Sequence, residues 1–599
     1  MRLKHLILTL SVFISGAAGY AQHSTVLKYL PARCNSVTSF NLLNIVSKIP
    51  GETFRQSGLY REMLKKDKGD LQAFFSNPSS SGVDFAAGFI FCMQAGEDGS
   101  PVPVLFGKLN NEAVFASTVR KLLKETDTVR AYGTNRILSS KNAGPALAWN
   151  EEIFIITGIA GRKEEVTKIF TDTTDTRDIN VKLEELNARI NRQLREQCFA
   201  LLTPKSEDAR FNAPAFTNLL NEPGDIKTWN SGTGRTAEAL KKLPPFLTSF
   251  VSRIQAASGM ERTSITNFEP GKISASYRSY VSKELAAVHQ QYPDEELPAG
   301  LAKRLPEGKI LALMMTAINP EKGKAIQQMS GMSELIDTLT RYLKVDLKQL
   351  AAAFGSKALL AVMELPAKVE NAEKKKNPFE NIGVLFAIPV KDKAALLKLK
   401  AVTDGLIDSL GKTDMGEKIL SKIKPVLRFD DSLCVISLSA DMAEAFLNNP
   451  GNGPLPSWIP AGGRGPMWMN INFREIINMA FTKSGSTDKP ARNKELKIKE
   501  AFSLFDRLIM TGEGFANGSL NSRMEFRFTD PDKNALLQLF EMINSLAGEK
   551  GKMKQAETLK VVPDEGEKME EVIIEEIPKE AAEPSPPAKK PVKGVKTKE

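Results

Sequence analysis

Two pairs of adjacent carboxylates are the residues of this sequence best suited to acid–base chemistry. Glu151-Glu152 and Asp430-Asp431 each lie in a polar segment between two apolar runs. A pair of carboxylates can act as general acid and general base in the hydrolysis of a glycosidic bond. Neighbouring residues of a strand point to opposite faces, however, so we interpret both pairs as polar hairpin turns.

The histidine content excludes most other catalytic arrangements. The chain has only His5, His23 and His289. A histidine-based triad or a zinc site with several histidines is therefore almost excluded. The sequence also lacks a Gly-x-Ser-x-Gly nucleophile elbow and a His-Glu-x-x-His motif. We assign no catalytic, cofactor-binding or metal-binding residues, and we favour a protein that is not an enzyme.

Two tryptophans with nearby asparagines are the candidate binding residues. Trp229 precedes Asn230, and Trp468 lies two positions before Asn470. Aromatic rings can stack on sugars or anchor a protein partner. Equivalent packing in two related cores is the alternative, and it is the commoner cause of matched tryptophans.

The four cysteines are too widely spaced for a disulfide scaffold or a Cys-x-x-Cys metal site. Cys92 and Cys434 lie in apolar runs typical of strands, where a cysteine is usually a small buried residue. We expect buried free thiols at these positions. A disulfide between Cys34 and another cysteine stays open, and the spacing of Cys198 does not favour any pairing.

An internal repeat organises the elements that carry these residues. Residues 146–157 align with residues 426–437, and each segment reads as strand, polar turn and strand. The same offset pairs Val104-Leu-Phe106 with Val384-Leu-Phe386. Because one offset serves two separate segments, we expect two homologous repeats.

The expected fold class is α+β. The repeats are assigned to residues 25–291 and 300–547, each a mainly antiparallel sheet covered by helices. Alternating apolar and polar residues over 510–528, around Asn517-Gly518, predict a β-hairpin. Amphipathic spacing predicts a helix over 181–202.

A second pair of matched segments supports the repeat. Gly271-Lys-Ile-Ser-Ala-Ser-Tyr277 resembles Gly518-Ser-Leu-Asn-Ser-Arg-Met524, and each begins the second arm of an expected hairpin.

The N-terminus predicts export. Arg2 and Lys4 precede an apolar run over 6–18, and small residues follow at a processing site. We expect residues 1–21 to be a signal peptide that is cleaved after Ala21. The mature protein is then periplasmic or extracellular.

Composition narrows the possible partners. The chain is 42% hydrophobic and 25% charged with a net charge of +10, as in an ordinary globular protein. It lacks a basic stripe interleaved with aromatic residues, which argues against nucleic acid. No segment after the signal peptide is apolar enough for a transmembrane span. Residues 548–599 separate acidic from basic residues around prolines, so we expect a disordered, charged tail.

Short motifs suggest a family. Ser39-Phe-Asn-Leu42, Ser81-Gly-Val-Asp84 and Gly224-Asp-Ile-Lys-Thr-Trp229 make residues 25–545 similar to the domain of unknown function 4836 family, which comprises exported, often lipid-anchored bacterial proteins. The resemblance implies location and architecture, and no activity. The sequence lacks the cysteine that follows the signal in lipid-anchored members.

The expected function is a non-enzymatic binding or scaffold role towards an envelope protein or polymer. One alternative is a hydrolase of envelope polysaccharide or peptide that uses carboxylates brought together by the fold. Another is a carrier that holds a hydrophobic ligand between the repeats.

Overall fold

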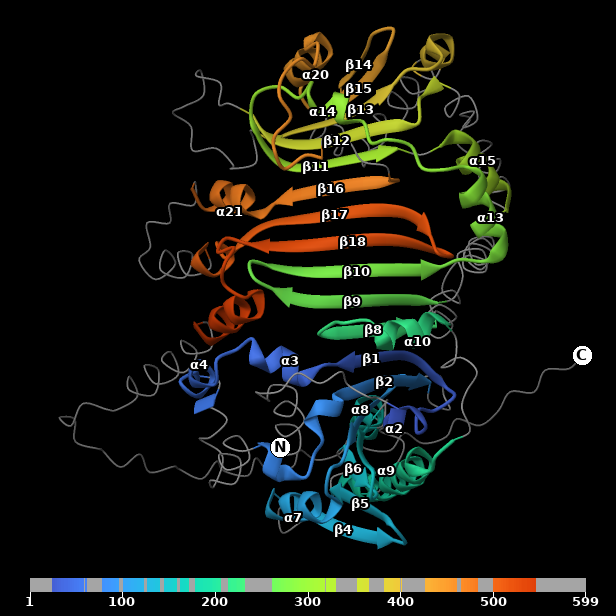
Figure 1. Cartoon of the computed structure of the whole chain (residues 1–599), viewed down its shortest axis with the longest axis vertical. Coiled ribbons are helices and arrows are strands. Elements are labelled where there is room, and N and C mark those ends of the chain that lie inside the picture. Colours follow the sequence, from blue (N-terminus) through green and yellow to red (C-terminus); the bar gives the residue numbers. More distant parts are fainter. Residues whose placement is uncertain are drawn as a thin grey trace, which may run out of the picture. The chain divides into compact units, whose positions relative to one another are not determined.

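The fold is built on one antiparallel β-sheet, seen in the computed structural model of Figure 1. The structure describes residues 24–58, 60–61, 78–95, 101–122, 127–140, 145–158, 162–171, 178–205, 214–231, 261–317, 319–329, 353–365, 382–398, 400, 426–460, 465–482 and 499–545. All of them belong to the first of two units into which the chain divides, Met1–Ala547 and Gly548–Glu599. The predicted signal peptide and the predicted tail lie outside the described residues.

Both predicted repeats contribute strands to this sheet. In the first half the strands are β1 (Cys34–Phe40), β2 (Phe89–Ala95), β3 (Pro101–Lys108), β4 (Asp127–Tyr132), β5 (Asn135–Ser140), β6 (Ala146–Trp149), β7 (Ile153–Thr157), β8 (Ile226–Asn230), β9 (Arg262–Glu269) and β10 (Lys272–Tyr280). In the second half they are β11 (Lys309–Ala317), β12 (Lys357–Glu364), β13 (Ile382–Pro389), β14 (Val426–Phe429), β15 (Leu433–Ser437), β16 (Met467–Asn472), β17 (Phe505–Ala516) and β18 (Ser519–Phe528).

Strand pairing follows the same order in both halves. From the central pair of β10 and β18, the first half continues through β9, β8, β1, β2, β3, β7 and β6. The second continues through β17, β16, β11, β12, β13, β15 and β14. Strands β5 and β4 extend the first half by one hairpin.

The pairing of β10 with β18, which joins the two halves, has a symmetric register. Lys272 of β10 pairs with Arg527 of β18, and Tyr280 pairs with Ser519. Aligning Gly271 with Gly518 makes Lys272 the counterpart of Ser519 and Tyr280 the counterpart of Arg527. The two pairs are therefore exchanged by the alignment, as a local twofold axis through the joint requires.

Helices cover the sheet in both halves. They are α2 (Ser24–Leu27), α3 (Leu42–Ser47), α4 (Gly51–Arg55), α7 (Glu112–Leu122), α8 (Arg162–Thr171), α9 (Ile179–Leu202), α10 (Pro214–Asn221), α13 (Lys283–Gln291), α14 (Ala299–Ala302), α15 (Pro320–Met329), α20 (Ala440–Asn448), α21 (Phe473–Thr482), a helix over 535–545, and the 3₁₀ turns η1 (Pro78–Ser81) and η2 (Phe85–Ala87). None of the helices in the described part of the chain is both long and apolar enough to cross a membrane.

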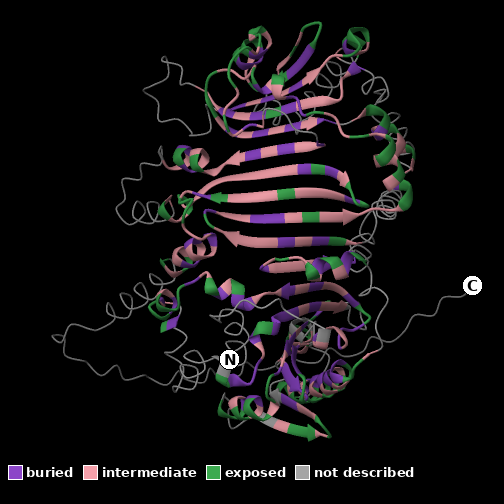
Figure 2. Cartoon of the chain, viewed as in Figure 1, coloured by how far each residue is buried: buried purple, intermediate pink, exposed green. Residues whose placement is uncertain are grey.

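The hydrophobic cores result from the alternation of side-chain direction along the strands. Along many strands, buried residues alternate with half-buried ones (Figure 2), as expected when successive side chains point to opposite faces. Strands β6 and β7 are buried on both faces, since α9 packs against one face and α7 against the other. In the second half α14 and α20 cover the face that corresponds to the α9 face.

The cysteines divide into one disulfide and two thiols. Cys34 of β1 is bonded to Cys92 of β2, with their Cα atoms 6.2 Å apart. The expectation of a free thiol at Cys92 was wrong, because pairing of β1 with β2 brings together two residues 58 positions apart. Cys198 and Cys434 are free and buried. Burial raises the pKa of Cys198 to about 12 and that of Cys434 to about 11, so both stay protonated at neutral pH.

Candidate functional site

The structure places both candidate tryptophans inside the protein. Trp229 is 0% exposed and packs edge to face against Phe216, with ring centroids 5.5 Å apart. Trp468 is 4% exposed and stacks on Trp458 at 6.0 Å. They lie in the separate cores of the two halves. Neither ring offers a surface on which a sugar could stack.

The two candidate asparagines are also apart. Asn230 is half-buried at the end of β8. Asn470 is 1% exposed in β16, and its side-chain amide has no hydrogen-bond partner within the described residues. The fold therefore does not assemble Trp229, Asn230, Trp468 and Asn470 into one site.

Both carboxylate pairs occupy hairpin turns, which confirms that interpretation. Glu152, between β6 and β7, accepts hydrogen bonds from the Tyr29 hydroxyl at 2.7 Å and Lys28 Nζ at 2.6 Å. The Lys28 contact, followed by that of Tyr29, lowers the pKa of Glu152. Asp430, between β14 and β15, accepts from the backbone N–H groups of Ser432 and Leu433, both at 2.7 Å. These carboxylates stabilise turns and a local ion pair.

An apolar pocket of about 510 Å³ opens on the sheet of the first half, on the face opposite α9. Its walls come from β1, β2, β3, β7, β8, β9, α3 and the helix over 535–545. It is lined by Phe40, Leu42, Ile45, Phe89, Phe91, Pro103, Leu105, Pro145, Ile156, Thr157, Gly158, Ile226, Phe268 and Leu536.

Register and alternation produce this lining. Phe40 of β1 is directly opposite both Phe89 of β2 and Ile226 of β8. Directly opposed residues point to the same face, so the three side chains form one row of the pocket floor. Phe91 and Leu105 are opposed in the next row. The sequence contains these residues in ordinary apolar strands, and only the non-local pairing makes them neighbours.

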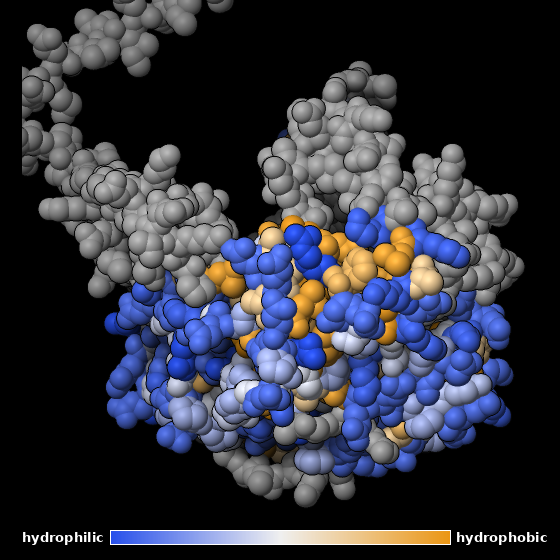
Figure 3. All heavy atoms as spheres, turned by 90° about the horizontal axis from the view of Figure 1, so that it is seen from above, coloured by the Kyte–Doolittle hydropathy of each residue, from blue (hydrophilic) through white to orange (hydrophobic). Residues whose placement is uncertain are grey.

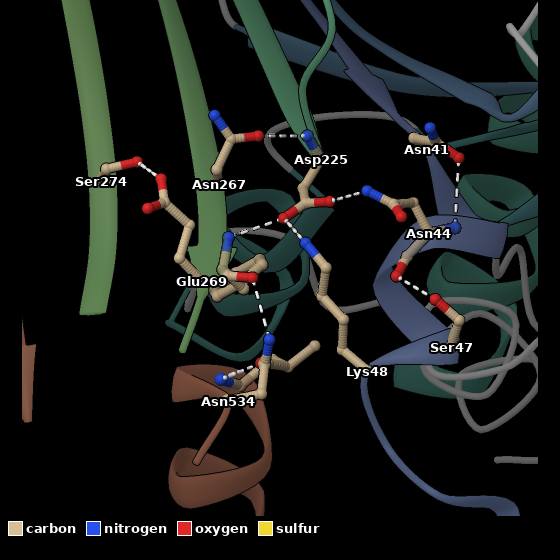
Figure 4. A network of polar contacts seen from close by, with 11 residues as sticks. Asn41, Asn44, Ser47, Lys48, Asp225, Asn267, Glu269, Ser274 and Asn534 are labelled. Carbon is tan, nitrogen blue, oxygen red and sulfur yellow. Dashed lines mark hydrogen bonds and ion pairs between the residues drawn. The ribbon is translucent and has the colours of Figure 1, made fainter. Parts of the chain in front are cut away.

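Asp225 is the centre of a polar network beside the pocket (Figure 4). Its carboxylate is buried and forms an ion pair with Lys48, the residue that follows α3. It also accepts hydrogen bonds from Asn44 Nδ2 and, at 2.6 Å, from the backbone N–H of Phe268. The backbone N–H of Asn41 donates to the Asp225 carbonyl at 2.8 Å. Asp225 thus ties both ends of α3 to β8 and β9.

The polar network holds α3 beside the pocket and adds no polar group to the pocket interior. Leu42 and Ile45 of α3 face the pocket, while Asn44 of the same helix and Lys48 directly after it bind Asp225. The one hydroxyl in the lining, Thr157 Oγ1, already accepts from Gln197 Nε2 at 2.7 Å. The site can therefore bind an apolar group by burial, with little hydrogen bonding to select a polar ligand.

Comparison with known proteins reveals little similarity. No protein-family model and no curated protein matches the sequence. Among solved structures, crystal forms III and IV of TP0453 match at 7% identity with a TM-score of 0.23, over 45% of this chain and 87% and 85% of that chain. A TM-score this low supports no argument about fold or function. The resemblance to the domain of unknown function 4836 family stays a prediction.

Proposed function

We propose that this chain is an exported envelope protein that binds an apolar ligand, of the character of a lipid acyl chain, in the pocket of the first half. The pocket itself is the observation that supports this function. Its volume of about 510 Å³ lies within the usual range for ligand sites, roughly 300–1,000 Å³.

The free energy of such binding comes from burial. Each methylene removed from water contributes about 0.8 kcal/mol, so about ten methylenes supply about 8 kcal/mol before the entropic cost of association. Aromatic walls from Phe40, Phe91 and Phe268 provide flat contact surfaces for a chain. The carboxylate of Asp225 is buried and its charge is balanced by that of Lys48, so it presents no unpaired charge to this side of the pocket.

A titration of delipidated protein with a fluorescent fatty-acid analogue tests this function. We expect saturable binding to the native chain and its loss in Leu105→Trp, which fills the pocket from β3 without adding charge. Leu397→Trp is the control, because Leu397 is 48% exposed and lies outside the lining. An absence of saturable binding to native protein would contradict the proposal. Circular dichroism of the variants separates loss of binding from loss of fold.

Export is part of the same proposal and rests on the N-terminal pattern. Protein recovered from the periplasm or the medium should begin at Gln22, directly after Ala21. N-terminal sequencing that starts at Met1 would contradict cleavage.

We also propose that residues 25–291 and 300–547 are homologous repeats. The matched order of strand pairing on both sides of β10 and β18 supports this, as does the match of residues 146–157 with 426–437. The register makes Leu385, and not Val384, the counterpart of Val104, because Val104 pairs with Thr157 and Leu385 with Ser437, so the shared offset expected for β3 and β13 was wrong by one residue. Alignment of related sequences should preserve the match of Gly271 with Gly518 if the repeats share an origin.

A partner-binding role is a second candidate, favoured by exposed apolar residues on β12, on β15 and directly after β15. Leu360, Ile436 and Leu438 are 38%, 41% and 46% exposed. Figure 3, which views the molecule from the end that carries α20 and β14, shows hydrophobic residues gathered on part of this surface. Crosslinking in intact envelopes should capture a partner with the native chain and lose it with Ile436→Glu.

A further inference from the structure

Four methionines form a row across four neighbouring strands of the second half. Met314 of β11 is directly opposite Met469 of β16, which is opposite Met510 of β17, which is opposite Met524 of β18. We call these four residues the methionine row. It continues into Leu360 of β12 on one side and Ala275 of β10 on the other.

The row lies on the sheet face opposite the core that α14 and α20 cover, which is also the face where Phe473 of α21 packs against Phe526 of β18. Met315, the neighbour of Met314 in β11, is 0% exposed and belongs to that core, whereas the four members of the row are half-buried. Directly opposed residues have Cβ atoms about 4.5–5.5 Å apart. Because methionine has three rotatable side-chain bonds, adjacent thioether sulfurs can converge on one point above the sheet.

Packing alone does not favour such a row. Methionine accounts for 19 of 599 residues, so four in direct register exceed what composition suggests. Strands prefer β-branched and aromatic residues. The parallel row on the same face has Ala312, Ile471, Leu508 and Phe526 at the corresponding positions, a mixture typical of a packed surface.

We propose that the methionine row binds a soft monovalent metal ion, Cu(I), through the thioether sulfurs of three adjacent members, Met469 and Met510 with one of their two outer neighbours. Thioethers are ligands that select Cu(I) over harder cations. Neutral sulfur ligands with apolar neighbours lack the oxygen atoms that Ca²⁺ and Mg²⁺ require. The site lies in the second half, on different strands from the apolar pocket, and does not depend on ligand binding there.

Metal titration of the full mature chain tests the site. Ag(I) serves as the redox-inert probe, and Cu(I) is added without oxygen in competition with a Cu(I) chelator. We expect about one bound ion per chain, the stoichiometry of a site that uses three sulfurs of a row of four. Replacing both central residues, Met469→Leu with Met510→Leu, should abolish binding. The matched control, Met315→Leu with Met363→Leu, changes two core methionines of the opposite side and should retain it.

Acidity distinguishes thioethers from the other soft ligands. A thioether takes up no proton between pH 5 and 8, so occupancy should be equal at both, whereas a thiolate or imidazole site weakens in acid. The variant Cys198→Ala with Cys434→Ala should bind as the native chain does. The proposal is overturned if native protein binds no ion, if the Met469→Leu, Met510→Leu chain binds equally well, or if the two cysteine substitutions abolish binding. Circular dichroism confirms that each variant is folded.

Discussion

Lys48, directly after α3, and Asp225, just before β8, form an ion pair whose carboxylate is fully buried. The two residues are 177 positions apart, and the pair fixes the helix that supplies Leu42 and Ile45 to the wall of the apolar pocket. A buried carboxylate, paired with a lysine, therefore helps to fix the geometry of an otherwise apolar site.

Lys48→Met should destabilise the protein strongly. Removing one partner leaves the buried Asp225 carboxylate without its countercharge, at a cost of about 3–5 kcal/mol in the free energy of unfolding. Urea denaturation measures the change. Lys393→Met is the matched control, because Lys393 pairs with Asp431 at the surface, where such a pair contributes about 0–1 kcal/mol. Equal effects of the two substitutions would contradict the structural role of the pair.

The stability of the chain should fall as pH decreases from 7 towards 5. Burial lowers the pKa of His289, and the nearby charge of Lys322 lowers it further, while Asp294 opposes the shift. The unfolded chain then binds a proton near pH 6.5 that the folded chain does not, so acid favours unfolding. Urea midpoints from pH 8 to 5 should show this decline in native protein and a flatter profile in His289→Gln. A decline of the same size in the variant would assign the effect to other groups.

Two turn glycines that the proposed repeat aligns should respond differently to alanine. Gly271 has φ +65°, and an added Cβ would lie 2.5 Å from the Pro531 backbone. Gly518 has φ +77° with nothing within 4 Å of an added Cβ. Gly518→Ala should cost about 1–2 kcal/mol for the left-handed conformation alone. Gly271→Ala should cost clearly more by thermal or urea unfolding, and equal costs would contradict the contact with Pro531.

The disulfide between Cys34 and Cys92 should stabilise the first half. Replacing both cysteines by alanine is expected to lower the free energy of unfolding by about 2–4 kcal/mol, mainly because the unfolded chain gains freedom. Reductant should lower the unfolding midpoint of the native protein and leave that of the double variant unchanged. A midpoint of native protein that is insensitive to reductant would show that the bond does not form.

Local signals made part of this fold predictable. The hairpin expected over 510–528 is β17 and β18 around Asn517-Gly518, and the helix expected over 181–202 is α9. The matched strand pairs over 146–157 and 426–437 are also present. Each depends on alternation, helical spacing or turn residues within one short segment.

The pocket was not predictable in this way. Phe40, Phe268 and Leu536 come together through strand pairing and through a helix from the far end of the described chain. Asp225 lies in the Gly224–Trp229 motif, but its partner Lys48 is identified only once α3 packs beside β8. The residue type of Trp229 and Trp468 makes them candidates in the sequence, whereas their burial depends on helices elsewhere in the sequence.

Photolabelling with a diazirine-bearing fatty acid, followed by peptide mapping, tests the apolar pocket most directly. We expect label to attach to peptides carrying lining residues such as Phe91, Leu105 and Phe268, and we expect Leu105→Trp to suppress this labelling. Label spread over the exposed apolar residues of β12 and β15, or equal labelling of Leu105→Trp, would contradict the claim that this pocket binds an apolar ligand.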